Sequence, residues 1–280
     1  MKPNELTCSH QQELVNEFFS RNAVYWKELY AMNGLFAIIH QQRYSIALRY
    51  IQELPLQKHA RVLEIGCGAG LLSAELARNG FSVESIDCSK SMVRTTYELI
   101  KNEKPKGNVE LTLCDAHSLP FREQSFDLVV ALGVIPWLYN LRKSLTEINR
   151  VLKNEGYILL NSDNNHRLNG LLDVPTLAKE LIKNKVIRAD FTVSSTDFPS
   201  VRMYSNKQFD RYLHEAKLNK IKTAGIGFGP FSLFNHYLFS DTVARKFNKI
   251  LQYYADKGNR FLRDLSSLYI VVAKKSGELS

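Results

Sequence analysis

The stretch Arg61-Val62-Leu63-Glu64-Ile65-Gly66-Cys67-Gly68-Ala69-Gly70 decides the fold of this chain. Its apolar residues form a short run that predicts a buried strand. The three glycines that follow allow the backbone to turn sharply and to lie directly against a ligand. A helix is expected to open at Leu71, and its first free N–H groups would face that ligand.

The spacing of the glycines narrows the kind of ligand. A dinucleotide-binding turn has the pattern G-x-G-x-x-G or G-x-G-x-x-A. Counted from Gly66, the last small residue of that pattern would fall at Leu71, which is too large. The chain instead has G-x-G-x-G, preceded by an acid at Glu64. The glycines alone also fit an ordinary strand-to-helix turn without a ligand.

Acidic residues recur where the following strands end. From Arg61 onward strands and helices alternate, which predicts a doubly wound, mostly parallel sheet with right-handed crossovers. Asp87 follows the second predicted strand and Asp115 the third. Ligands of such sheets bind at the carboxyl ends of the strands, where a carboxylate can accept hydrogen bonds from a ribose diol. A second carboxylate can accept from an exocyclic amino group such as adenine N6.

With these residues in place, the chain resembles the class I S-adenosylmethionine (SAM) methyltransferases that act on small molecules, such as those of ubiquinone and menaquinone synthesis. The segments that carry the resemblance are 62–70, 85–92, 114–121, 125–133 and 147–160. The resemblance implies a Rossmann-like sheet of seven strands, mostly parallel with the last strand antiparallel. It also implies SAM as the cofactor and S-adenosylhomocysteine (SAH) as its product.

The same resemblance assigns cofactor contacts to residues at the strand ends. The glycines would hold the methionine end of SAM, Asp87 the ribose hydroxyls and Asp115 the adenine. The full set that the resemblance implies is Glu64, Gly66, Cys67, Gly68, Gly70, Asp87, Cys88, Met92, Asp115, Ala116 and Leu132.

Two helices are expected before the glycine turn, over 9–33 and 37–54. They are interpreted as a lid over the cofactor, with Tyr30 facing it and Arg43 binding the SAM carboxylate. The alternative is a pair of helices that simply packs on the edge of the sheet.

We expect four regions along the chain. Residues 1–56 form the N-terminal helical lid, and residues 57–162 form the SAM-binding core. Residues 163–217 are too long for one crossover and predict a helical cap insertion. Residues 218–280 return to the sheet as two strands, with an inserted aromatic and helical segment between them.

Transfer of a methyl group from a sulfonium is an in-line displacement, for which positioning supplies most of the rate. A hydroxyl acceptor also needs a general base. The catalytic candidate is His166, in the loop after the fifth strand, although a loop histidine is also an ordinary surface residue. Asp163 and His117 are alternatives, with His40 and His236 further off.

The acceptor is expected to lie among aromatic side chains, although such residues also serve as ordinary core. No N-P-P-Y-like run, Pro-Cys nucleophile or paired-glutamate loop is present, which leaves a small-molecule or lipid-like acceptor by elimination. The predicted acceptor pocket consists of Tyr25, Trp137, Asn164, Phe228 and Phe231, with Phe234 and Tyr237 as further wall candidates.

Charge and composition bound the other possibilities. The net charge is +9, and residues 161–280 carry 19 basic and 11 acidic side chains. This excess indicates an acidic acceptor, a membrane surface or simply a solvated lysine-rich face. No basic run is interleaved with aromatic residues, so nucleic acid is not favoured.

Location follows from what the sequence lacks. There is no apolar run long enough for a membrane span and no signal peptide. Four cysteines without C-x-x-C pairing predict a reducing, cytoplasmic location and no metal site.

Three functions therefore compete. The leading one is a SAM-dependent methyltransferase with a small-molecule acceptor. The alternatives are a SAM-binding assembly or regulatory subunit without turnover, and an RNA or protein methyltransferase that docks through its basic C-terminal region. The sequence leaves the oligomeric state open.

Overall fold

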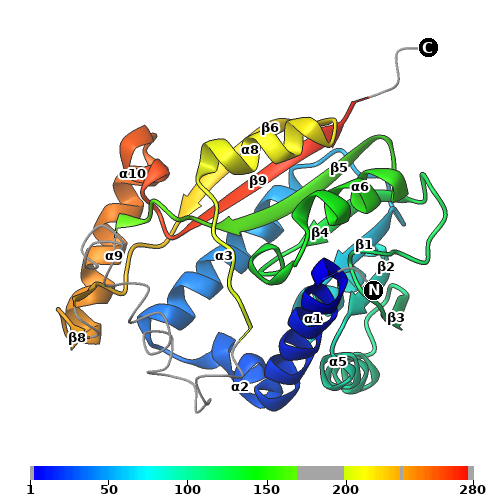
Figure 1. Cartoon of the computed structure of the whole chain (residues 1–280), viewed down its shortest axis with the longest axis horizontal. Coiled ribbons are helices and arrows are strands. Elements are labelled where there is room, and N and C mark those ends of the chain that lie inside the picture. The colour runs from blue at the N-terminus through cyan, green and yellow to red at the C-terminus, as the bar shows by residue number, and fades with distance from the viewer. Residues whose placement is uncertain (1–2, 169–198, 234–235, 277–280) are drawn as a thin grey trace.

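A seven-stranded sheet forms the centre of the protein (Figure 1), which is described here from a computed structural model over residues 3–168, 199–233 and 236–276. The strand order is β3-β2-β1-β4-β5-β9-β6, and β9 is antiparallel to both of its neighbours. The predicted fold class, with its antiparallel last strand, is thereby confirmed. The strands are β1 (Arg61–Ile65), β2 (Ser82–Asp87), β3 (Val109–Leu113), β4 (Phe126–Ala131), β5 (Leu152–Asp163), β6 (Leu218–Ile226) and β9 (Leu268–Lys275).

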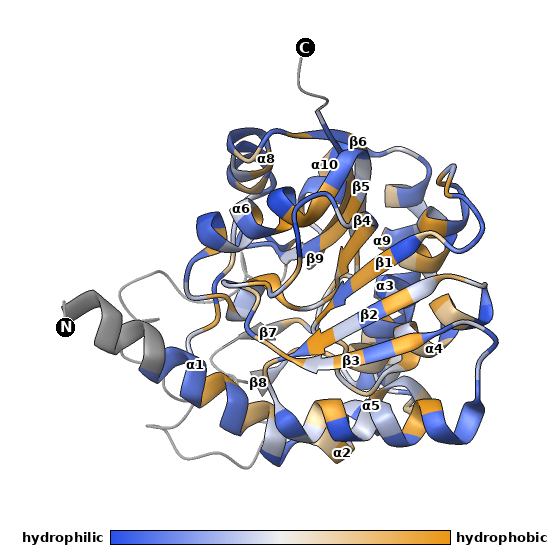
Figure 2. Cartoon of the chain, turned by 90° about the vertical axis from the view of Figure 1, so that its right-hand side faces the viewer, coloured by the Kyte–Doolittle hydropathy of each residue, from blue (hydrophilic) through white to orange (hydrophobic). Residues whose placement is uncertain are grey.

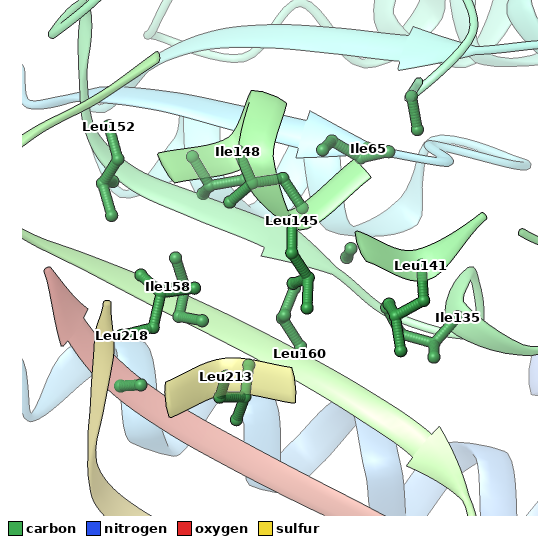
Figure 3. Packing of buried hydrophobic residues seen from close by; sticks show 14 of the residues in the cluster. Ile65, Ile135, Leu141, Leu145, Ile148, Leu152, Ile158, Leu160, Leu213 and Leu218 are labelled. Atoms are coloured by element: carbon green, nitrogen blue, oxygen red, sulfur yellow. The ribbon is translucent and has the colours of Figure 1, made fainter. Parts of the chain in front are cut away.

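Helices α6 (Leu141–Val151) and α8 (Asn206–Glu215) cover one face of the sheet. Their apolar sides, including Leu145 and Leu213, are buried against Ile158 and Leu160 of β5 (Figure 3). Both helices begin at a side-chain cap, because Asn140 and Ser205 each accept a hydrogen bond from a backbone N–H of the first turn.

Helix α8 was expected in the cap insertion, and it belongs instead to the packing of the sheet. Its buried Phe209 and Leu213 lie in the same core cluster as the residues of α6. The spacing of its apolar residues predicts a helix with one buried face. The sequence does not say which element that face packs against. The remainder of the expected cap, 169–198, lies outside the described residues.

Helices α3 (Leu35–Gln52), α4 (Leu71–Arg78) and α5 (Lys90–Glu103) lie on the other side of the sheet (Figure 2). Ala47 and Ile51 of α3 pack with Leu76 of α4 against the strands. Helix α3 was predicted as part of a lid, but its apolar stripe is buried in the core. Its residue Arg43 nevertheless lies against Gly133, in the loop after β4.

The N-terminal residues form α1 (Pro3–Arg21), α2 (Ala23–Glu28) and the 3-10 helix η1 (Leu29–Ala31), not the single predicted helix over 9–33. The break falls at Asn22, whose side-chain amide donates to the carbonyl of Phe18 at 2.7 Å. Such a local bond competes with regular helix geometry. The C-terminal end of helix α1 meets the start of α5 (Figure 2), where Ser20 Oγ is 3.0 Å from Oγ of Ser89, the residue that caps α5.

The apolar run over 157–161 predicts a strand, but β5 begins five residues earlier, at Leu152. The Asn-Glu-Gly sequence at 154–156 predicts a turn before that strand, but these residues form a bulge within β5, where Leu152 pairs with Phe126 and Tyr157 pairs with Leu128. Glu155 takes a positive φ of 64° at this point. A bulge of this kind inserts residues without ending the strand.

The segment between β6 and β9 forms a small unit at one end of the molecule (Figure 1). Helix α9 (Asp241–Asp256) is the helical part of the inserted segment that the sequence predicts between these two strands. Helix α10 (Arg260–Asp264) and the hairpin of β7 (Ser232–Leu233) and β8 (His236–Tyr237) were not predicted. Phe228 and Phe231, both expected in the acceptor pocket, are buried in a cluster with Ala255 of α9. Their position indicates a packing role.

Candidate functional site

The glycine turn is closed by hydrogen bonds to the neighbouring strand. The N–H groups of Gly66 and Cys67 both donate to the carbonyl of Ile86, at 2.7 and 3.0 Å. A Cβ added at Gly66 would lie 2.4 Å from Cγ2 of Val134, in the loop after β4. Two features therefore require glycine at position 66: the close approach of Val134 and the positive φ of 73°.

Gly70 and Gly68 differ in what surrounds them. A Cβ at Gly70 would lie 2.7 Å from Cγ2 and 3.0 Å from Cα of Thr96, where α4 and α5 pack together. A Cβ at Gly68 would meet nothing within 4 Å. Of the three glycines, Gly68 is the one that presents bare backbone to open space, as a ligand that lies on the turn requires.

Asp87 faces this open backbone. Its Oδ2 accepts from the N–H of Gly68 at 3.0 Å, and its Oδ1 accepts from the N–H of Ser89 at 2.8 Å. Each carboxylate oxygen keeps a further lone pair, so the group can still accept two hydroxyl donors. Burial raises the pKa of Asp87, and the hydrogen bonds from Ser89 and Gly68 oppose that shift.

The residues after Asp87 are less polar. Cys88 is half-buried, and burial raises the pKa of its thiol to about 12, so the thiol is protonated and unreactive at neutral pH. Met92 is fully buried in the first turn of α5. Ala116 and Leu132, after β3 and β4, are buried and partly buried, respectively. These side chains follow the carboxyl ends of β2, β3 and β4, and they are apolar or, at Cys88, an uncharged thiol.

Glu64 lies beneath the turn in a buried hydrogen-bond network. Ser73 Oγ donates to Glu64 Oε2 at 2.5 Å, and Ser85 Oγ lies 2.9 Å from Ser73 Oγ. Burial raises the pKa of Glu64 to about 7, against the opposing hydrogen bonds from the two serines. In this structure Glu64 therefore ties β1 to α4 and β2.

This network predicts a pH dependence of stability. The native pKa of about 7 lies above the ordinary 4.5, so the folded state holds the proton more tightly than the unfolded chain. The stabilisation is fully present below about pH 4.5 and is lost as the pH rises through about 7. Relative to Glu64→Gln, the wild type should lose up to about 3 kcal/mol of unfolding free energy between pH 4.5 and 8. Urea unfolding of both proteins measures this difference, and parallel pH curves would contradict it.

Asp115 is bound to His117, two residues further on. Asp115 Oδ1 accepts from the backbone N–H of His117 at 2.9 Å and lies 2.5 Å from its Nδ1. His117 Nε2 accepts from the N–H of Asn140 at 3.2 Å, and its ring stacks on Tyr139 at 3.6 Å. Burial alone would raise the pKa of Asp115, but the hydrogen bonds from His117 lower it.

Both ring nitrogens of His117 are therefore occupied, which removes it as a general base. Asp115 stays charged and about one-third exposed at the end of β3. It keeps lone pairs for an amino group of a ligand.

Arg43 reaches the same edge from α3. Its side chain is buried, its Nη2 donates to Tyr30 Oη at 3.2 Å, and a Cβ at Gly133 would lie 2.7 Å from its Nη1. The N–H of Gly133 in turn donates to Asn161 Oδ1 at 2.7 Å. Arg43 therefore lies against the backbone that follows β4.

Two buried donors near this loop lack hydrogen bonds among the described residues: Arg43 Nε and Asn161 Nδ2. An unpaired buried donor costs roughly 1–3 kcal/mol, and more when it is charged. Both suit a ligand that carries carboxylate or other acceptor oxygens. Asn161 was not predicted as a site residue, although an amide directly after the apolar run 157–160 was a usable signal.

A group of aromatic rings continues from the loop after β4 into the N-terminal helices. Phe18 stacks on Trp137 with ring centroids 5.4 Å apart, and Phe19 lies 5.7 Å from Trp26. Trp26 is also 5.9 Å from the ring of His40. We name this group the aromatic belt, consisting of Phe18, Phe19, Trp26, Phe36, His40 and Trp137.

The belt contains or touches two predicted acceptor residues. Trp137 is a member, and Tyr25 contacts Trp26 at 5.7 Å. The sequence did not place Phe18, Phe19, Trp26 and Phe36 in the pocket, and it offered His40 only as a distant candidate base, because the meeting of these residues with Trp137 depends on the fold. Burial, with a smaller effect of Arg43, lowers the pKa of His40 to about 3, so this histidine is neutral within the belt.

Asn164 and His166 lie in the turn after β5. Asn164 is buried; its Nδ2 donates to the carbonyls of Asp264 and Ser266 at 2.8 and 2.9 Å. Its Oδ1 accepts from the N–H of His166 at 3.0 Å. Asn164 was predicted in the acceptor pocket, but its side-chain amide forms hydrogen bonds with backbone groups of the protein. His166 is held at its backbone and is exposed.

A metal site and a membrane-spanning helix are both absent from the described residues. Within the described ranges, no group of three or more His, Cys, Asp and Glu side chains is arranged to hold a metal ion. Cys67, Cys88 and Cys114 are free thiols. No helix in the part of the chain that the structure describes is long and apolar enough to cross a membrane.

Comparison with known proteins agrees with this geometry. Residues 63–160 match the family model described as a methyltransferase domain. The ubiquinone biosynthesis O-methyltransferase of Rickettsia prowazekii is 29% identical over 138 residues, which cover 47% of this chain and 53% of that protein. The enzyme of the same name from Hydrogenovibrio crunogenus is 23% identical over 229 residues, or 82% of this chain and 88% of that protein.

A solved structure shows a similar fold over most of the chain. Magnesium protoporphyrin IX methyltransferase from Synechocystis, with bound SAH, has a TM-score of 0.59 at 17% identity and covers 95% of this chain and 100% of its own. This chain spans about half the length of the Rickettsia relative that it matches. Residues 63–160 are thus similar to a methyltransferase domain, and the chain shares its fold with a methyltransferase whose structure holds bound SAH.

Proposed function

We propose that this protein is a SAM-dependent methyltransferase that acts on an apolar, small-molecule or lipid-like acceptor. The observation that carries the proposal is the bare backbone of Gly68 beside the Asp87 carboxylate. The unpaired buried donors of Arg43 and Asn161, near the loop after β4, also support the proposal. Hydroxyl, adenine and carboxylate groups of one ligand match these acceptors and donors.

The residues fit SAM as follows. Asp87 accepts from the ribose hydroxyls, Asp115 accepts from the adenine amino group, and Gly68 lies under the methionine part. Arg43 and Asn161 bind its carboxylate, with Tyr30 positioning Arg43. When bound, SAM supplies a methyl group that is already activated as a sulfonium, so the protein has mainly to position and desolvate the acceptor.

The aromatic belt is the proposed acceptor surface. It begins at Trp137, directly after the loop at the carboxyl end of β4, and its rings are contributed by the helices that lie over this edge. Rings at this position bind an apolar acceptor and exclude water from the reacting atoms. Relatives named for ubiquinone biosynthesis agree with an acceptor of this kind. The cytoplasmic location predicted from the sequence stays a prediction.

For a hydroxyl acceptor, we propose His166 as the general base. It follows β5 at the same edge, and Asn164 holds its backbone in place. His166→Ala is expected to lower kcat by on the order of 10²–10⁴-fold, with SAM affinity unchanged, and to remove the base limb of the pH–rate profile. His10→Ala, which changes an exposed histidine of α1, is the control. An unchanged profile in His166→Ala would exclude this role.

The proposal is tested by transfer of labelled methyl groups. Protein, labelled SAM and a whole-cell extract are incubated, and label is then measured separately in small molecules, RNA and protein. The expected result is label in small molecules that partition into organic solvent, together with SAH. Label in RNA or protein would support a macromolecular methyltransferase instead. SAM binding without label transfer would support a regulatory subunit.

A further inference from the structure

Helix α9 carries its large apolar side chains on the side that faces solvent. Val243, Phe247, Ile250 and Tyr254 are 38%, 43%, 55% and 53% exposed. Their spacing of three and four residues places them in one row along the helix. We name this row the α9 stripe.

The buried side of α9 is unusually polar. Asn248 Oδ1 accepts from the N–H of Phe228 at 2.8 Å, and Gln252 bonds the N–H of Gly227 and the carbonyl of Gly225 at 2.9 and 3.0 Å. These bonds fix the helix to the end of β6. The α9 stripe is therefore not needed to hold the helix in place, and its exposed apolar side chains need a different explanation.

The hairpin next to α9 extends the same surface. Phe239, after β8, stacks on Phe247 of the stripe with ring centroids 5.1 Å apart and planes 28° apart. Tyr237 and Leu238 beside it are 58% and 43% exposed. The helix and residues 237–239 thus present neighbouring exposed apolar side chains. Helix α9 and β8 lie together at one end of the molecule (Figure 1).

Basic residues border this surface. Lys246 and Lys249 are exposed on α9, each directly before a residue of the stripe, and the exposed Lys257 caps the C-terminal end of the helix. Residues 241–264 carry six basic and three acidic side chains, and the last 120 residues hold the chain's excess of positive charge. An apolar row bordered by lysines is typical of helices that lie flat in the interface of an anionic membrane.

We propose that the α9 stripe, together with Tyr237, Leu238 and Phe239, docks this protein on an anionic lipid surface. The apolar side chains enter the interface, and the bordering lysines bind the lipid phosphates. The charge of the border favours a lipid surface over a second copy of the chain, because two copies would bring like charges together.

The docking surface lies close to the proposed acceptor surface. Asp241, the first residue of α9, accepts from the N–H of Leu35 at 2.8 Å. The next residue along α3 is Phe36, whose ring is 4.2 Å from that of His40 in the aromatic belt. A lipid-like acceptor would thus have a short route from the interface to the belt. The docking itself does not require methyl transfer.

Vesicle flotation of the full chain tests the docking directly. Vesicles of phosphatidylcholine with 30% phosphatidylglycerol, a proportion chosen as about that of an anionic membrane, are compared with pure phosphatidylcholine. No SAM is present, so a failure of docking is separate from a failure of the proposed activity. The wild type is expected to bind the anionic vesicles at least about tenfold more tightly, and added salt should reduce the difference.

Two double variants separate the apolar and the charged contributions to binding, and a third double variant is the control. Phe247→Gln with Ile250→Gln should weaken vesicle binding about tenfold or more, because the apolar insertion is lost. Lys246→Gln with Lys249→Gln should weaken it about 25-fold, or about fivefold for each lysine. Tyr97→Gln with Leu113→Gln changes two side chains of similar exposure on α5 and β3 and should bind as the wild type does.

The outcomes that overturn the proposal are distinct. One is equal binding to anionic and neutral vesicles, or none to either. Another is unchanged binding in the stripe variant while circular dichroism shows all variants folded. A third is a concentration-dependent dimer that the stripe variant dissolves, because the surface would then belong to a second copy.

Discussion

Gly70→Asn is expected to destabilise the fold strongly, whereas Gly68→Asn, two residues earlier, is expected to leave the fold intact and weaken cofactor binding. Asparagine tolerates the positive φ of both positions, so the two variants differ mainly in the space around the new side chain. At Gly70 the new Cβ meets backbone and side chain of Thr96, at a cost of about 3 kcal/mol. At Gly68 it meets nothing within 4 Å.

Urea unfolding and SAH binding by equilibrium dialysis measure both effects. Gly68→Asn should keep the unfolding free energy within about 1 kcal/mol of the wild type, since the new side chain is not forced against its neighbours. Its affinity for SAH should fall at least about tenfold, because the added side chain fills the space over the turn. Wild-type SAH affinity in Gly68→Asn would show that the cofactor does not lie on this turn. Wild-type stability in Gly70→Asn would show that α4 and α5 can separate freely.

Asp87→Asn is expected to weaken binding of SAM and SAH by about 10- to 150-fold. The change keeps the size of the side chain but removes the charge and one acceptor oxygen. Hydrogen bonds to a charged group contribute roughly 1.5–3 kcal/mol, which corresponds to this range of affinity. The structure predicts a specific effect here because Asp87 bonds the backbone of Gly68 and keeps further acceptor capacity for a ligand.

Asp127→Asn is the matched control for this variant. Asp127 also accepts a backbone hydrogen bond, from Arg61 at 2.9 Å, and it pairs with Lys153 at 2.7 Å. It lies near the amino end of β4, whereas Asp87 lies at the carboxyl end of β2, so the two carboxylates are at opposite ends of the parallel strands. Its replacement should leave SAM affinity within about twofold, since no cofactor contact is expected there. Equal loss in both variants would indicate a general structural effect, and no loss in Asp87→Asn would remove the ribose assignment.

Much of the fold was predictable because local signals agreed with one another. The apolar runs over 62–65, 126–131 and 268–274 predict strands, and each lies in the sheet within one or two residues of its predicted bounds. The helix starts at Ser89 and Asn140 were also predictable, because their side chains cap the first turn as expected.

The roles within the glycine turn were not predictable from spacing. Gly66, Gly68 and Gly70 appear equivalent in the sequence, but Val134 and Thr96 crowd two of them and leave the third open. Those neighbours come from segments 26 or more residues away along the chain. Only the folded arrangement shows which backbone a ligand can reach.

Polar residues near strand ends were the hardest to assign. His117 and Asn164 had the chemistry of site residues, yet both use their side chains on partners within the protein. Asn161 had no such assignment, and it carries a buried donor without a partner in the described structure. Whether a polar group is available to a ligand depends on tertiary hydrogen bonds, which a sequence pattern does not encode.

Calorimetric titration of the wild-type protein with SAM and with SAH tests the central claim most directly. The geometry at Gly68, Asp87 and Arg43 predicts one site per chain for each ligand, with a dissociation constant in the range of about 1 μM to 1 mM that is usual for enzyme substrates. Adenosine alone should bind more weakly, because Arg43 and Asn161 would remain without their partner. A folded protein that binds neither SAM nor SAH would contradict the assignment of this strand edge as a cofactor site.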